Sequence, residues 1–158
     1  MIEMAAFGAG CFWSVEYKFS KMPGVLRTSA GYMGGEESQD KVTYEQVCFG
    51  KTGHAEVVRI EYDTNIIKYE DLLDVFWELH DPTQLNKQGP DVGEQYRSII
   101  FYYNNVQKEK AEKSRDKIQL ELGEKKIVTQ IVKAGKFYMA EEYHQKYLEK
   151  RGKDSCSI

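Results

Sequence analysis

The segment MAAFGAGCFW, residues 4–13, is the stretch around which the rest of the chain is organised. Its first four residues form an apolar run that predicts a strand, and Gly8 and Gly10 then interrupt that pattern. Beyond the glycines, the residues of one helical face recur at the expected spacing, at Phe12, Val15, Glu16 and Phe19. The segment therefore predicts a strand, a tight glycine turn and a helix, with Cys11 where the helix begins.

Cys11 occupies a position where a thiol becomes a good nucleophile. The first N–H groups of a helix have no partner within the helix, and the helix dipole adds partial positive charge there. Both effects favour a thiolate over a thiol, so the expected pKa of Cys11 falls. Gly8 and Gly10 would let a backbone or a substrate approach the sulfur closely. The alternative is that Cys11 is a small buried apolar residue, which is the usual role of a single cysteine.

Composition argues against several classes of protein. The 158 residues suit one domain, and the net charge is −3 with no basic stripe of the kind that binds nucleic acid. No apolar run has the length of a membrane helix, and Glu3, without a basic segment before it, argues against a signal peptide. Three cysteines at irregular spacing, without a C-x-x-C pair, fit reactive thiols better than a disulfide scaffold. We therefore expect a cytoplasmic protein that contacts neither nucleic acid nor membrane and binds no metal.

Apolar periodicity and turn residues divide the chain into strands and helices. Strands are expected at 2–7, 25–32, 57–62, 97–103 and 126–133, and helices at 11–21, 69–79, 105–122 and 140–151. Residues 42–48 are ambiguous between a loop and a short helix, and 83–95 read as a long loop that is functional or disordered. Reduced to its core, the order is β-α-β-β-α-β, which predicts an α+β, ferredoxin-like two-layer sandwich with added helices and long active-site loops. In this prediction, residues 1–151 form a single catalytic domain and residues 152–158 a mobile tail.

Three motifs resemble those of the peptide methionine sulfoxide reductase A family. They are Gly10-Cys11-Phe12-Trp13, the glycine-histidine-alanine-glutamate sequence at 53–56, and GEQYRS at 93–98. The matches follow in the family's order over nearly the whole chain. The resemblance implies a thiol-dependent oxidoreductase that reduces methionine sulfoxide, free or in proteins, and that selects the S epimer at sulfur. It also implies an α+β sandwich with extended loops over the site, no metal or organic cofactor, and thioredoxin as the reductant.

Reduction of a sulfoxide by a thiolate requires a proton donor beside the departing oxygen. A carboxylic acid can supply the proton if burial raises its pKa. Glu56 stands at the start of an apolar strand, where desolvation would have this effect, although a glutamate at such a place is usually a surface residue. The resemblance implies that Glu56 is the acid that protonates the sulfoxide oxygen.

Hydroxyl groups and aromatic rings complete the expected site. Tyr44 and Tyr96 can each donate an O–H to the oxygen, and both fall where the family carries its substrate-holding tyrosines. Asp91 matches the family's aspartate that helps to order the site. Phe12 and Trp13 would bind the methyl group, since contacts between sulfur and aromatic rings are favourable. Without the resemblance, these five would be packing tyrosines, a loop residue and the start of a core helix.

A second thiol is expected to complete the reaction cycle. Attack leaves a sulfenic acid on Cys11, which another thiol can convert to a disulfide. Cys48 has apolar neighbours on both sides, and such a cysteine is usually buried and inert. Cys156 lies in the polar tail, and the chain from Leu148 spans at most about 26–29 Å, so Cys156 can reach Cys11. We therefore expect Cys156 to resolve the sulfenic acid, with a dispensable terminal thiol as the alternative.

Two other functions remain open at this point. His54, two residues before Glu56, allows a thiol hydrolase or acyl transferase in which the imidazole activates Cys11. A non-enzymatic ferredoxin-like binding module would need no reactive thiol. His80 and His144 have no partner at metal-ligand spacing, and structural roles are expected for both.

Overall fold

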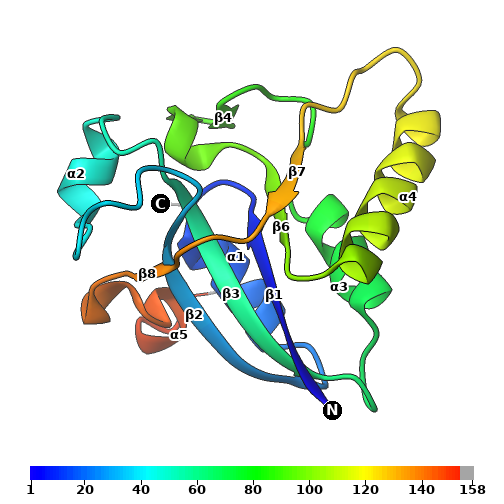
Figure 1. The fold of residues 1–158 in the computed structure, drawn as a ribbon, viewed down its shortest axis with the longest axis horizontal. Coiled ribbons are helices and arrows are strands. Elements are labelled where there is room, and N and C mark those ends of the chain that lie inside the picture. The colour runs from blue at the N-terminus through cyan, green and yellow to red at the C-terminus, as the bar shows by residue number, and fades with distance from the viewer. Residues whose placement is uncertain (154–158) are drawn as a thin grey trace.

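A six-stranded mixed sheet forms the centre of the computed structural model, which describes residues 1–153 (Figure 1). The strands lie in the order β7-β6-β1-β3-β2-β8. Neighbouring strands are antiparallel except β6 and β7, which are parallel. Their bounds are β1 Ile2–Gly8, β2 Val25–Met33, β3 Ala55–Asp63, β6 Ile99–Tyr102, β7 Gln130–Lys133 and β8 Tyr138–Met139. The fold class is therefore α+β, as the sequence predicts.

Helices connect the strands and a small hairpin precedes β6. The α-helices are α1 Phe12–Ser20, α2 Tyr44–Cys48, α3 Tyr69–Glu78, α4 Asn105–Leu122 and α5 Tyr147–Lys150. The hairpin consists of β4 Lys87–Gln88 and β5 Asp91–Val92, and the 3₁₀ helices are η1 Glu94–Tyr96 and η2 Glu142–His144. In residues 1–153, no helix has both the length and the apolar character needed to cross a membrane.

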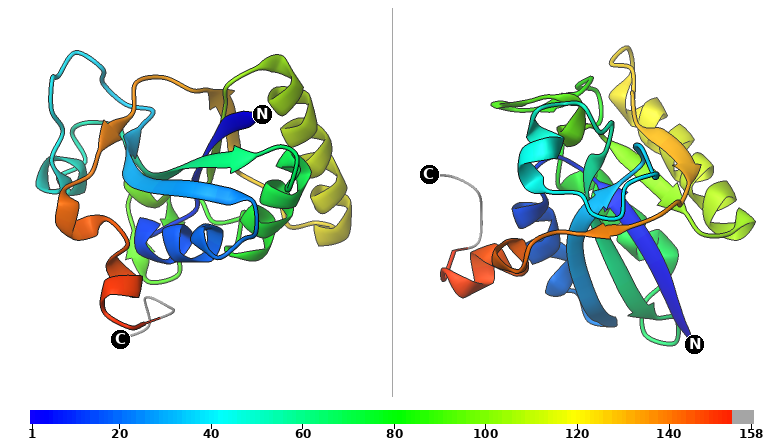
Figure 2. Two further views of the ribbon diagram at one scale, coloured as in Figure 1. Left: turned by 90° about the horizontal axis from the view of Figure 1, so that it is seen from below. Right: turned by 60° about the vertical axis from the view of Figure 1, so that its left-hand side comes forward.

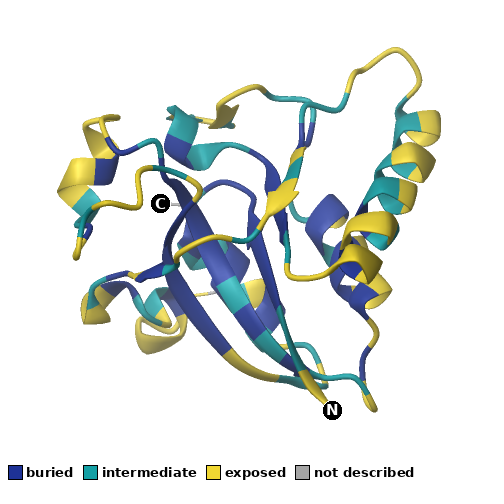
Figure 3. Ribbon diagram, viewed as in Figure 1, coloured by how far each residue is buried: buried dark blue, intermediate teal, exposed yellow. Residues whose placement is uncertain are grey.

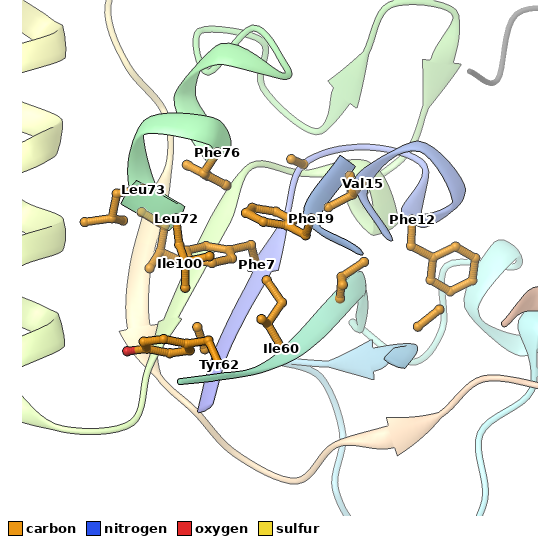
Figure 4. Packing of buried hydrophobic residues seen from close by; sticks show 14 of the residues in the cluster. Phe7, Phe12, Val15, Phe19, Ile60, Tyr62, Leu72, Leu73, Phe76 and Ile100 are labelled. Atoms are coloured by element: carbon orange, nitrogen blue, oxygen red, sulfur yellow. The ribbon is translucent and has the colours of Figure 1, made fainter. Parts of the chain in front are cut away.

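The main core lies between the sheet and helices α1 and α3. Phe7 of β1 stacks on Phe19 of α1 at a centroid separation of 5.2 Å and meets Phe76 of α3 at 5.3 Å (Figure 4). These aromatic contacts, each worth about 0.5–1.5 kcal/mol beyond area burial, join both helices to the central strand. The core therefore anchors the turn between β1 and α1, which carries Cys11.

The first residues of strand β3 are buried on both faces of the sheet. Val58, Ile60 and Tyr62 belong to the cluster under α1 and α3, as the alternating pattern predicts. Val57 belongs to a second cluster on the opposite face, covered by Phe137 from the segment that joins β7 to β8. Figure 2 shows this segment crossing the sheet opposite α1, and Figure 3 shows the buried centre of the three long strands. Both layers hold the first residues of β3, including Glu56, inside the protein.

Several predicted elements are confirmed, and local signals explain their ends. Helix α4 begins after Asn104, whose side-chain oxygen accepts from the N–H of Gln107 at 2.9 Å, and Gly123 follows it at φ +64°. The ambiguous segment 42–48 contains α2, which begins with a capping box formed by Thr43 and Gln46. These caps satisfy N–H groups that no helical bond can reach.

The prediction of one helix over 140–151 is wrong. The chain instead forms η2, an extended residue at Gln145, a left-handed residue at Lys146 with φ +53°, and the short α5. The Gln145 side chain bonds both the N–H and the carbonyl of Ala30 at 2.8 Å, and also the carbonyl of Ala140 at 3.0 Å. These tertiary hydrogen bonds outweigh the helical periodicity, because they attach the segment to the edge of β2.

Two other expectations also need correction. The strand expected at 126–133 is limited to β7, residues 130–133, because only these residues pair with β6. The long loop expected at 83–95 is an ordered hairpin followed by η1. The Gln88 side chain holds this hairpin by bonding both the N–H and the carbonyl of Asp81 at 2.9 Å.

Glu16 ties three distant parts of the chain together beneath the site. Its carboxyl group is 2% exposed and accepts from the hydroxyl of Thr28 at 2.9 Å and from the N–H of Lys146 at 2.7 Å. Because buried polar groups must find partners, these bonds fix the C-terminal segment against α1 and β2.

We expect Glu16→Ala to lower the free energy of unfolding by about 3 kcal/mol, because two buried donors lose their acceptor. Glu16→Gln keeps one side-chain oxygen and should cost about 1 kcal/mol. Urea denaturation measures both changes, and hydrogen exchange should show faster opening of residues 141–148 in the alanine variant. Lys18→Ala, at an exposed position of the same helix, serves as the control. Equal stability of Glu16→Ala and the control would contradict this account.

Candidate active site

Cys11 lies at the N-cap of α1, as the sequence predicts. Its backbone is non-helical, with φ −59° and ψ 122°, and Gly10 before it has φ +94°, a conformation that favours glycine. The side chain is partly exposed. It lines a cavity of about 160 Å³ together with Ala9, Ser14, Val15, Lys18, Leu79, Gln88 and Asp91. The thiol therefore sits at the positive end of a helix and remains accessible from outside.

Glu56 lies beside this helix start. One of its carboxyl oxygens, Oε1, accepts from the backbone N–H of Phe12 at 3.2 Å, and the side chain is 2% exposed. Strand β3 places it there because β3 pairs antiparallel with β1, with Val58 opposite Phe7, so Glu56 lies beside the end of β1. A carboxyl group and a thiol thus share the N-terminal end of α1.

Tyr44 and Tyr96 bring two phenol groups to the same carboxyl. The two phenols act on each other electrostatically, and the charge of Glu56 acts on both. Burial, followed by the field of Glu56, raises the pKa of Tyr96 to about 12, and burial also raises the pKa of Tyr44. Both hydroxyls therefore keep their protons at neutral pH and can donate hydrogen bonds.

Arg97 holds together the two loops that carry these groups. Its Nη2 donates to the carbonyl of Gly53 at 3.0 Å, and its Nη1 donates to the carbonyl of Glu94 at 2.9 Å. The first loop leads into β3 and Glu56, and the second into η1 and Tyr96. The guanidinium thus fixes the position of the acid relative to that of the phenol.

Asp91 begins the second strand of the hairpin. It lines the cavity beside Cys11, and its charge acts on Tyr96. The hairpin is closed by the N–H of Gly93, which donates to the carbonyl of Asn86 at 2.9 Å. The structure therefore gathers all the predicted site residues from Cys11 to Tyr96 at one end of the sheet.

Phe12 and Trp13 form an aromatic wall next to Cys11. Phe12 is 1% exposed and packs against Tyr32, with ring centroids 5.8 Å apart. Trp13 is partly buried, stacks on Tyr147 at 3.7 Å, and donates its indole N–H to Nδ1 of His144 at 3.0 Å. One ring is thus fixed in the core, and the other lies at the edge of the site.

Both ring nitrogens of His54 contact backbone groups, so His54 does not resemble a catalytic base. Its Nδ1 accepts from the N–H of Gly35 at 2.9 Å, and its Nε2 lies 2.9 Å from the carbonyl of Glu36. Burial lowers its pKa. With both nitrogens bonded to the loop after β2, the imidazole supports that loop. Over residues 1–153, no cluster of His, Cys, Asp and Glu could hold a metal ion.

Of the two remaining cysteines, Cys48 belongs to the described residues and Cys156 does not. Cys48, expected to be buried, is exposed at the C-terminal end of α2, because the short helix stands off the sheet. Partial desolvation raises the pKa of the Cys48 thiol, and the influence of the Tyr44 hydroxyl opposes this rise. Cys156 lies outside the described residues, so the expected tail and its disulfide remain predictions.

Sequence reasoning assigned no role in the site to two residues that border it, Glu141 and His144. Glu141 accepts from the hydroxyl of Tyr32 at 3.0 Å and from the N–H of Tyr44 at 3.1 Å. His144 is 1% exposed and lies against the rings of Phe12 and Tyr44. Acidic, aromatic and amide side chains cluster at 141–145, and this cluster could have indicated a role in the site. The apolar residues of 140–151 have helical spacing, however, which led to the wrong prediction of one helix.

Comparison with known proteins finds similar sequences and similar folds. The family model described as "Peptide methionine sulfoxide reductase" matches residues 3–158. A peptide methionine sulfoxide reductase MsrA from Methanothermobacter thermautotrophicus is 56% identical over 99% of this chain and 92% of its own length. Mxr1 from Saccharomyces cerevisiae in reduced form superposes with a TM-score of 0.90 at 37% identity, covering 96% of this chain and 86% of that one. Mxr1 in complex with Trx2 shares the fold, with a TM-score of 0.65 at 24% identity, over 92% of this chain and 84% of that one. These matches show that the chain belongs to the peptide methionine sulfoxide reductase family.

Proposed function

We propose that this methionine sulfoxide reductase acts on the S epimer, with Cys11 as nucleophile and Glu56 as acid. The observation that carries the assignment is the bond from the N–H of Phe12 to Glu56, which places the carboxyl beside the residue that follows Cys11. A nucleophile and a proton donor are the two groups that the reaction requires.

In the proposed reaction, the Cys11 thiolate attacks the sulfoxide sulfur while Glu56 protonates the oxygen. Tyr44 and Tyr96 donate hydrogen bonds to that oxygen, and Asp91 orders their side of the site. The oxygen then moves to Cys11, so methionine is released and Cys11 becomes a sulfenic acid. The sulfoxide is reduced by two electrons and the thiol is oxidised by two.

Phe12 and Trp13 are the proposed binding site for the methyl group. Both rings follow Cys11 directly, so a methyl group held against them brings its sulfur close to the thiol. Contacts of sulfur with aromatic rings are favourable by about 0.3–1.5 kcal/mol each. Recognition of a single side chain accounts for activity on the free amino acid as well as on proteins.

Cys156 is the proposed resolving thiol. Its attack on the sulfenic acid forms a Cys11–Cys156 disulfide and releases water, and thioredoxin then reduces the disulfide. Cys48 is the poorer candidate, because its raised pKa keeps the thiol protonated at neutral pH. The complex of Mxr1 with Trx2 is consistent with such a reductant.

For the fold, we propose the ferredoxin-like assignment. The four central strands have the order β6-β1-β3-β2, all antiparallel, and α1 and α3 lie in the two crossover connections. Strands β7 and β8 extend this unit at its two edges.

The function is tested by a single turnover without reductant. Mixing the reduced protein with racemic methionine sulfoxide should yield about one equivalent of methionine per chain, from the S epimer only, with a Cys11–Cys156 disulfide left behind. Cys11→Ser should yield none. Cys156→Ser should still yield methionine, with the sulfenic acid remaining on Cys11. Chiral chromatography and mass mapping of the cysteines provide the readouts, and methionine production by Cys11→Ser would overturn the assignment.

We expect Glu56→Gln to slow methionine formation in a single turnover by about 10²–10⁴-fold, because an amide cannot supply the proton. The amide oxygen can still accept from the N–H of Phe12, so the fold should persist. Glu61→Gln, on the same strand, is the matched control and should leave the rate unchanged. If Glu56→Gln reacts at the wild-type rate, Glu56 is not the acid.

Tyr44→Phe and Tyr96→Phe should each reduce the single-turnover rate by about tenfold, since each removes one hydrogen bond that strengthens as charge develops on the oxygen. The double variant should lose more than either single variant. Tyr69→Phe removes a buried hydroxyl without a hydrogen-bond partner among the described residues and provides the control. Unchanged rates in both single variants would exclude the phenols from the reaction.

A further inference from the structure

We propose that His144 is a positioning residue that holds the Trp13 indole in its substrate-binding orientation through the bond from Nε1–H to Nδ1. The inference rests on the proposed role of Trp13 in binding the methyl group. It adds a residue 131 positions away in the chain that acts through Trp13.

His144 lies at the centre of the aromatic wall. Its ring is 5.2 Å from that of Phe12, 5.8 Å from that of Trp13 and 4.6 Å from that of Tyr44, measured between centroids. At 1% exposure it is covered on every side, with Tyr143 at 4.1 Å on the outside. One side chain thus contacts both proposed methyl-binding rings and a proposed oxygen-binding phenol.

The hydrogen bond defines the chemical state of His144. An indole N–H can only donate, so Nδ1 must carry a lone pair, and the neutral ring then has its proton on Nε2. Burial lowers the pKa of His144, while the charge of Glu141 opposes this, so the accepting form is the one present at neutral pH. No described residue forms a hydrogen bond with Nε2, so accepting from Trp13 is the one polar contact that orients the ring.

The segment around His144 is held in place by hydrogen bonds to the sheet, to α2 and to α1. Glu141 is bonded to Tyr32 and to the N–H of Tyr44, and Gln145 makes three bonds to the backbone. The N–H of Lys146 donates to buried Glu16. These bonds hold the residues on both sides of His144, so the position of its backbone is set independently of Trp13.

Trp13 itself depends on two contacts from this segment. Tyr147 stacks on the indole with an interplanar angle of 9°, which holds the plane of the ring, and His144 holds its N–H edge. A stack alone permits sliding and rotation within the plane, whereas a hydrogen bond selects one orientation. Loss of the acceptor therefore leaves the indole in contact with Tyr147 but no longer aligned beside Phe12.

The test compares two substitutions in the full chain by single turnover without reductant. His144→Phe keeps an aromatic ring but removes the acceptor, and it should raise the half-saturating concentration of methionine sulfoxide about tenfold while the maximal rate stays within about twofold. His144→Asn places an oxygen where Nδ1 was and should restore the half-saturating concentration to within about threefold of the wild-type value. If both variants behave as wild type, or if Asn rescues no better than Phe, the proposal is wrong.

A direct readout of the bond is the Trp13 indole N–H resonance. The chain has two tryptophans, and the N–H of Trp77 is bonded to Ser114 instead, so its signal serves as an internal reference. In His144→Phe, the Trp13 signal should shift and exchange with solvent faster, while that of Trp77 stays unchanged. An unchanged Trp13 signal in this variant would overturn the proposal, and a loss of both signals would show that the variant does not fold, in which case the Asn variant decides.

Trp13→Ala separates this inference from the proposed function. If Trp13→Ala raises the half-saturating concentration and His144→Phe does not, the methyl site stands and the role of His144 is wrong. If Trp13→Ala has no effect, the methyl site itself is wrong and the inference fails with it. In the Trp13→Phe background, where the donor is absent, His144→Phe should change the half-saturating concentration by no more than about twofold, since the pair acts as a unit.

Discussion

The contact between the N-terminal end of α1 and the carboxyl of Glu56 is the constraint on which the site depends. It is formed by a helix N–H that has no partner within the helix and by one oxygen, Oε1, of a buried carboxyl, so each of these two atoms gains a partner. It requires that the helix start and the first residues of β3 lie at the same end of the sheet. The antiparallel pairing of β1 with β3 meets this requirement, because the end of β1 then lies beside the beginning of β3.

The remaining site residues are held by hydrogen bonds between side chains and backbone, and not by packing in the apolar core. Arg97 links the loops of Glu56 and Tyr96, His54 supports the loop after β2, and Gln88 fastens the hairpin of Asp91. Loops have few apolar contacts to order them, so their position depends on such bonds between side chain and backbone. This explains why His54 is buried and Arg97 is half-buried, although neither has a place in the proposed proton transfer.

The C-terminal segment contributes to the site as much as the central turn does. Glu141 holds Tyr32 and Tyr44, His144 and Tyr147 hold Trp13, and Glu16 holds the backbone of Lys146. The segment that precedes Cys156 in the chain is therefore also a wall of the proposed methyl site. Movement of this segment would change the surroundings of Trp13.

Local sequence signals predict the strand, glycine turn and helix around Cys11, the helices α3 and α4, the α+β class, and the motifs that resemble the reductase family. These features depend on periodicity, caps and turn residues, which act over a few neighbouring positions. Four features depend on tertiary contacts: Glu56 accepts from the N–H of Phe12, both nitrogens of His54 bond to the backbone, Cys48 is exposed, and residues 140–151 do not form one helix. Each of these outcomes depends on partners far away in the sequence: the bonds of Gln145 to Ala30 span 115 positions, and no local propensity encodes them.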